Sequence, residues 1–269
     1  MVKKLFKHEF LAWLRLSWVV AAVVMTIAGA HRILQLFESD SPIYMLINVL
    51  TLIIYGLSVM AAMYFPVVYA VIRFYKNLFS GEGYLSFTLP VTPTQHLWVK
   101  SLTATAMSLA VALVCLLSGM LITAGDVFTE VCKLIGYFLH KLPDGQLWHY
   151  IGVAAETFVL LVVSFFAGHL MFYTCICLGQ LFRKHRLVGA VAVYFIYYYA
   201  TQILAVIFGV VMEILEMNGT LNPLYSWCAQ HVIATTHISL LGSLAINGGM
   251  AVLCFFLCRW VMTRKLNLE

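Results

Sequence analysis

Charge is scarce in this sequence. Charged residues make up 10% of its 269 residues and hydrophobic residues 63%, whereas about a quarter of an ordinary soluble domain is charged. A soluble fold of this size needs polar side chains to cover its surface. The composition therefore excludes a soluble fold. The formal net charge of +5 does not indicate nucleic acid as a partner, because the basic residues lie in short clusters between apolar runs.

Motifs of catalysis and nucleotide binding are also absent. The sequence contains no G-x-x-x-x-G-K-[ST], H-E-x-x-H, G-x-S-x-G or C-x-x-C pattern. Its cysteines lack the spacing of metal ligands: Cys175 and Cys177 point to different sides of a helix. Cys254 and Cys258 share a face, where cysteine usually serves as a small apolar packer. We therefore expect no catalytic residue, metal site or cofactor in this chain. If ATP drives its activity, ATP and Mg²⁺ bind to another polypeptide.

Long apolar runs dominate the sequence instead. Each is long enough to cross a hydrocarbon core of about 30 Å, which takes about 20 helical residues. In lipid, the backbone N–H and C=O groups must form their hydrogen bonds within the protein, which a helix achieves. These runs also lack the alternation of apolar and polar residues that is typical of transmembrane strands, so we expect helices. The sequence predicts an all-α integral membrane protein with a single transmembrane domain over residues 1–269. The six predicted spans are residues 16–36, 44–72, 97–124, 152–181, 187–215 and 237–262.

The distribution of Lys and Arg predicts how these spans are oriented. With the N-terminus inside, thirteen basic residues fall on the cytoplasmic side and three on the outer side, as the positive-inside rule expects. Both termini are then predicted to be cytoplasmic. The inner set is Lys3, Lys4, Lys7, Arg15, Arg73, Lys76, Lys100, Arg183, Lys184, Arg186, Arg259, Arg264 and Lys265, and the outer set is Arg32, Lys133 and Lys141.

Two segments outside the spans are amphipathic. Residues 1–15 place apolar side chains at helical spacing, with lysines and Glu9 between them, which is typical of a helix at the membrane surface. A signal peptide is the alternative, because a basic start precedes an apolar stretch and the small residues 28–30. Residues 125–150 carry an apolar stripe and are predicted to lie on the outer membrane surface.

The predicted cytoplasmic segment 73–96, between spans two and three, is the most informative part of the sequence. It begins with Phe74, Leu78 and Phe79 on one face of a short helix. The glycines that follow permit a sharp turn. A partner that moves such an element, clamped between two spans, also moves the spans.

The same segment resembles the loop between the second and third spans of ABC-2-type ABC transporter permeases. That loop runs as an acidic residue, a Gly, an apolar pair, a Pro-Val-like turn with a following Ser or Thr, and a Lys that opens the next span. Here those positions are Glu82, Gly83, Tyr84-Leu85, Pro90-Val91-Thr92 and Lys100. The family often has Thr where this chain has Tyr84. The resemblance extends to the amphipathic start, the six spans and the cytoplasmic ends.

The resemblance implies an ABC-2 exporter-like permease subunit of the bacterial cytoplasmic membrane, with peptides, antimicrobial compounds or lipids as cargo. Such subunits pair as homo- or heterodimers, and each contacts a separate ABC ATPase through this loop. Closure of the ATPases then switches the pathway between the spans from inward- to outward-facing. The alternative is that this loop is only a turn that shields the ends of the two spans. The residues implied in ATPase coupling are Phe74, Leu78, Phe79, Glu82, Gly83, Leu85, Pro90 and Lys100.

Polar residues within the spans are candidates for a translocation path, because ionisable groups in lipid are costly and usually face a bundle interior or a cavity. The candidates are His169 in span four and, on one face of span five, Tyr194, Tyr198, Thr201 and Gln202. Hydrogen bonding within the bundle is the alternative for all of them. His231 and His237 are predicted near the outer end of span six, and since only His169 is central, we expect no haem site.

Two other functions stay open on the sequence alone. One is a membrane scaffold or sensor component without transport. The other is a membrane-embedded or lipid-modifying enzyme, for which the Ser and His residues, scattered at different depths, provide no site. A co-purifying ATPase distinguishes the permease from both.

Overall fold

The computed structural model describes residues 2–37, 39–79, 91–124, 129–130, 132–133, 136, 147–182 and 185–264. All regular secondary structure in these residues is helical, which confirms the predicted all-α class. The chain divides into two compact units, Met1–Leu147 (unit 1) and Trp148–Glu269 (unit 2). Each unit is described by itself below. The prediction of a single transmembrane domain stays a prediction.

Among the described residues, six helices are long and apolar enough to cross a membrane. The chain is therefore a multi-pass helical membrane protein. The shortest of these helices has 30 residues, more than the roughly 20 that a span needs, so each must tilt or extend beyond the hydrocarbon core. They are α1 (Val2–Gln35), α2 (Pro42–Phe79), α4 (Pro93–Ile122), α6 (Leu147–Gly179), α7 (Arg186–Met217) and α9 (Val232–Arg264).

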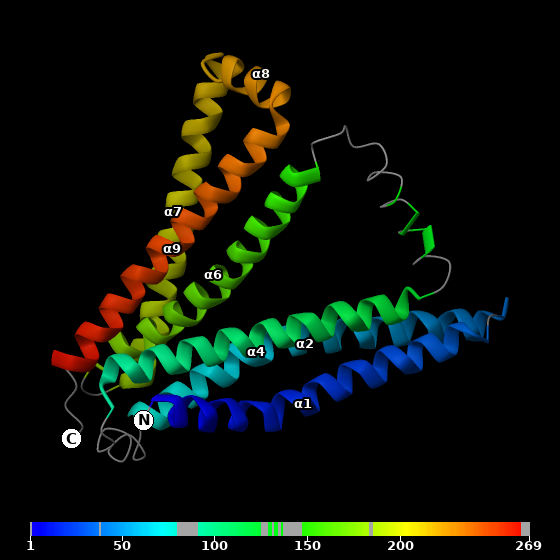
Figure 1. Ribbon diagram of the computed structural model, residues 1–269, viewed down its shortest axis with the longest axis horizontal. Helices are drawn as coiled ribbons and strands as arrows, with labels where there is room; N and C mark the ends of the chain where they lie inside the picture. The colour runs from blue at the N-terminus through cyan, green and yellow to red at the C-terminus, as the bar shows by residue number, and fades with distance from the viewer. Residues whose placement is uncertain are drawn as a thin grey trace. The chain divides into compact units, whose positions relative to one another are not determined.

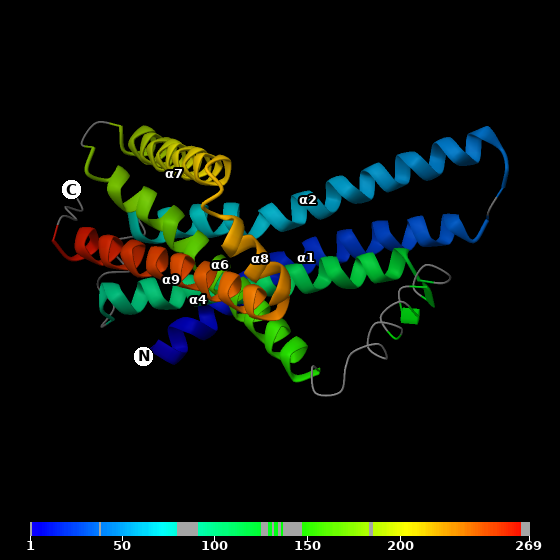
Figure 2. The ribbon, with the colours of Figure 1, turned by 90° about the horizontal axis from the view of Figure 1, so that it is seen from above.

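Unit 1 is built from α1, α2 and α4, which run lengthwise beside one another in both views (Figures 1 and 2). Successive helices run in opposite directions, because the start of α1 meets the end of α2 and the start of α4. Val24, Ala62 and Val111, one from each helix, form an apolar cluster in the unit's interior. These contacts hold the three helices as one bundle.

Helix α4 is lined with small polar residues that are buried. The hydroxyls of Thr103, Thr105 and Ser108 donate to backbone carbonyls one turn earlier, at 2.7, 2.9 and 3.0 Å. Each hydroxyl is thereby satisfied within its own helix. Small residues of this kind let helices approach closely in a membrane, where no hydrophobic effect drives helices together.

The ends of the unit 1 helices differ from the predicted boundaries. Residues 2–15 are helical, as predicted, but continue without a break into the first span; their position at the membrane surface stays a prediction. Residues 73–79 form the last two turns of α2 rather than a separate short helix. Helix α4 begins at Pro93, four residues earlier than predicted, because Thr92 and Gln95 form a capping box. Most of segment 125–150 and all of residues 80–90 lie outside the described residues.

Unit 2 contains α6, α7 and α9, with the short helix α8 (Asn222–Gln230) between the last two. The hydroxyl of Thr174 on α6 lies 3.1 Å from the carbonyl oxygen of Cys254 and 3.2 Å from the Sγ of Cys258, both on α9. Nearer the start of these two helices, Glu156 contacts His237. Because early residues meet early residues and late meet late, α6 and α9 run parallel.

Helix α8 is an element that the sequence analysis did not predict. The turn before it contains Gly219, whose φ of 70° glycine adopts without steric cost. Pro223 stands in the first turn of α8, where its missing N–H leaves no bond broken. A helix of 9 residues is too short for its apolar residues to show a reliable helical periodicity.

Candidate functional site

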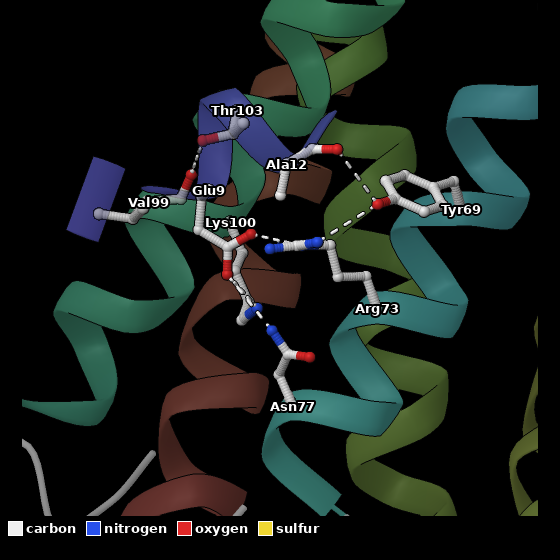
Figure 3. Close-up of polar contacts among 8 residues, drawn as sticks. All are labelled: Glu9, Ala12, Tyr69, Arg73, Asn77, Val99, Lys100 and Thr103. Carbon is white, nitrogen blue, oxygen red and sulfur yellow. Dashed lines mark hydrogen bonds and ion pairs between the residues drawn. The ribbon is translucent and has the colours of Figure 1, made fainter. Parts of the chain in front are cut away.

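A buried carboxylate at one end of unit 1 is the main polar feature of the described residues. Glu9, on α1, is only 6% exposed. Its Oε2 accepts a hydrogen bond from Arg73 Nε at 2.5 Å, and its Oε1 accepts one from Lys100 Nζ at 2.7 Å. Asn77 Nδ2 approaches the same Oε1 at 3.5 Å (Figure 3). We refer to Glu9, Arg73, Asn77 and Lys100 as the Glu9 cluster.

Each of the three helices contributes to the cluster near one of its ends. Glu9 lies two turns from the start of α1, Arg73 two turns from the end of α2, and Lys100 two turns from the start of α4. The antiparallel order of the three helices brings these positions to one level. The cluster therefore ties together the two helices that flank residues 80–90, and ties both to α1.

Aromatic packing holds the arginine in position. Arg73 Nη1 donates to the hydroxyl of Tyr69 at 3.2 Å, and the guanidinium carbon lies 5.9 Å from the centre of that ring. Trp13 of α1 meets the Tyr69 ring edge-on, with ring centroids 4.6 Å apart. Both α1 and α2 thus restrict the rotamer of Arg73, which keeps its Nε directed at Glu9.

The charges of the cluster do not cancel. One carboxylate faces two cations, so the cluster carries a formal charge of +1. Lys100 is 6% exposed, and an ion removed from water is stable only when it is paired and hydrogen-bonded. Glu9 is therefore a counter-charge for the buried Lys100. A movement of α1 away from α4 breaks this ion pair.

The residues predicted for ATPase coupling fall into three groups. Phe74, Leu78 and Phe79 are buried, and the rings of the two phenylalanines are 5.7 Å apart. Their role in ATPase coupling stays a prediction. Lys100 belongs to the Glu9 cluster. The remaining four, Glu82, Gly83, Leu85 and Pro90, lie outside the described residues.

The translocation-path candidates of α7 lie along one stretch of that helix. The ring of Tyr194 stacks on Phe172 of α6 at 5.6 Å and on Tyr198 at 6.4 Å. Thr201 donates back to the carbonyl of Tyr198 at 2.8 Å. Tyr198 and Gln202 are exposed, whereas His169 of α6 is buried. The structure thus links Tyr194 to α6, and the role of these residues in a path stays a prediction.

A buried histidine of unit 1 was not among the predicted site residues. His31 Nδ1 lies 2.8 Å from the hydroxyl of Thr51, which itself donates to the carbonyl of Asn48. His31 Nε2 lies 3.1 Å from the amide nitrogen of Gln35. A neutral ring protonated on Nδ1 satisfies all of these contacts. His31 thus joins α1 to α2 at the end opposite to the Glu9 cluster.

Comparison with known proteins found no matching family model, no matching curated protein and no matching solved structure. The functional argument therefore depends on the residues of this chain.

Proposed function

We propose that this chain is the membrane-spanning permease subunit of an ATP-driven ABC exporter of the ABC-2 type, and that a separate chain carries the ATPase. Its place is the bacterial cytoplasmic membrane, with both termini in the cytoplasm and a second permease subunit as its dimer partner. The proposed cargo is a peptide, an antimicrobial compound or a lipid. The multi-pass helical architecture and the motif from Glu82 to Lys100 support this function.

The observation that carries the proposal furthest is the Glu9 cluster. A transport subunit must convert the movement of a cytoplasmic segment into a movement of its spans. Residues 80–90 join α2 to α4, and the adjoining ends of both helices are bonded to Glu9. Because these bonds are short, charged and largely buried, a force on the segment is passed to three helices together.

The test is whether an ABC ATPase co-purifies with the chain. The full chain, tagged and expressed in bacterial membranes, is extracted in a mild detergent and probed for bound ATPase. Glu82→Ala removes the acidic residue of the motif, and Glu130→Ala removes an exposed acid of the predicted outer segment as the matched control. We expect about tenfold less ATPase with Glu82→Ala, which corresponds to 1.4 kcal/mol, and the wild-type amount with Glu130→Ala.

Two results contradict different parts of this proposal. Equal recovery of the ATPase with both variants would show that the segment around Glu82 is not the contact. Absence of any ATPase from the wild-type preparation would overturn the permease function and favour a scaffold or sensor role.

A further inference from the structure

The starts of α6 and α9 hold a second polar cluster, in unit 2. The carboxylate oxygens of Glu156 lie 2.8 and 2.9 Å from Nδ1 of His237. The ring of His149, two turns before Glu156 on α6, lies edge-on to the His237 ring with centroids 6.2 Å apart. Gly152 lies between them on α6, and a Cβ at this position would lie 3.4 Å from Cε1 of His237, in ordinary van der Waals contact.

The contact with Glu156 fixes the chemical state of His237. A carboxylate accepts a hydrogen bond from Nδ1–H, so in the neutral ring the lone pair is on Nε2. Metal-binding histidines are usually held this way, with one nitrogen on the metal and the other donating to a carboxylate. Glu156 therefore leaves the second nitrogen of His237 available as a ligand beside another imidazole.

We propose that His149 and His237 bind a divalent transition-metal ion of the Zn²⁺ class, with Glu156 positioning the His237 ring. Imidazole nitrogen suits Zn²⁺, Cu²⁺ and Ni²⁺. The described residues contain no group of three or more His, Cys, Asp or Glu arranged around an ion, so water completes the coordination. The site is independent of the proposed transport function.

The two rings are near the spacing that a shared ion requires. With metal–nitrogen distances of about 2.0–2.1 Å, two imidazoles on one tetrahedral ion have ring centroids roughly 5 Å apart. The observed 6.2 Å leaves a gap of about 1 Å to close. His149 is exposed and lies in the first turn of α6, so its side chain has the freedom to make this movement.

His231 provides a matched control. It lies at the boundary between α8 and α9, next to the same end of unit 2, and is exposed. Its Nδ1 lies 3.0 Å from the carbonyl of Trp227, and its ring stacks on that indole at 4.8 Å. It has the same ionisable group as His149 and His237, but within the part of the chain that the structure describes it makes no carboxylate contact.

The experiment is a calorimetric titration of the purified full chain, without a histidine tag, with Zn²⁺. The wild-type chain is expected to bind one ion per chain at this site. His149→Gln and His237→Gln are expected to weaken binding by at least about tenfold and Glu156→Gln by about tenfold, since outer-shell partners contribute 10- to 100-fold. His231→Gln should bind as the wild type does.

An independent measurement guards against a misfolded variant. Cu²⁺ bound to the wild-type chain should give an electron paramagnetic resonance spectrum with the splitting of two imidazole nitrogens. Saturable Zn²⁺ binding that survives both ligand substitutions would overturn the assignment. So would a wild-type chain that binds no Zn²⁺ or a Cu²⁺ spectrum without nitrogen splitting.

Discussion

Replacing Glu9 with glutamine is expected to lower the free energy of unfolding by about 3 kcal/mol, because it removes the buried carboxylate that pairs with both Arg73 and Lys100. Glutamine keeps the shape and one acceptor oxygen but cannot neutralise Lys100, which is 6% exposed. The measurement is reversible unfolding in mixed micelles, followed by helical circular dichroism.

The chain contains its own control for this prediction. Glu130 and Lys133 also form an ion pair, at 3.1 Å, but both side chains are 72% exposed. Exposed pairs contribute little, so Glu130→Gln should change the free energy of unfolding by less than about 1 kcal/mol. If Glu9→Gln has as small an effect as Glu130→Gln, the cluster does not stabilise unit 1.

A double substitution measures the contribution of the Glu9–Lys100 pair itself. Lys100→Met removes the ammonium and keeps a long apolar side chain. If the loss of this pair is responsible, Lys100→Met should cost less in the Glu9→Gln background than in the wild type, with a coupling energy of at least about 1 kcal/mol. If the effects of the two changes are additive, the free energy of unfolding lost in Glu9→Gln comes from another interaction, for example the bond from Glu9 to Arg73.

The long helices were predictable, and the Glu9 cluster was not. Each span follows from a continuous stretch of sequence, because the chain must satisfy its backbone in lipid locally. The partners of Glu9 are 64 and 91 residues away, and nothing local to residues 2–15 shows which side of α1 is buried. The sequence therefore marked Glu9 only as a polar residue of an amphipathic helix.

One signal in the sequence did point to Glu9. The predicted inner side holds thirteen basic residues. An acid at position 9 among them calls for a basic partner, and Arg73 and Lys100 lie at the ends of two neighbouring predicted spans. The contact of Glu156 with His237 was less predictable: His237 was predicted near the outer end of its span, but hydropathy does not tell which faces of α6 and α9 meet.

Close packing between α6 and α7 depends on glycine, and a single methyl group should disrupt it. A Cβ at Gly179 would lie 2.5 Å from the backbone nitrogen of Ala190 and 2.7 Å from its Cα. A backbone cannot rotate away as a side chain does, so the two helices must separate. We expect Gly179→Ala to lower the free energy of unfolding by about 2 kcal/mol, within the range seen for overpacked cores.

Two other glycines distinguish this clash from a general effect of alanine. Gly168, on the same helix, has no neighbour within 4 Å, so Gly168→Ala should stabilise the chain by up to about 1 kcal/mol through helix propensity. A Cβ at Gly189 would meet the ring of Phe182 at 2.5 Å, but that side chain is exposed and can swing out. The nearest backbone atom, the carbonyl oxygen of Gly179, would lie 3.1 Å away, farther than the backbone atoms that meet a Cβ at Gly179. Gly189→Ala should therefore cost less than Gly179→Ala.

Adding Ala190→Gly should not rescue Gly179→Ala, because the backbone atoms of residue 190 remain. Full rescue would show that the clash is with the Ala190 side chain and that the helix backbones are free to adjust.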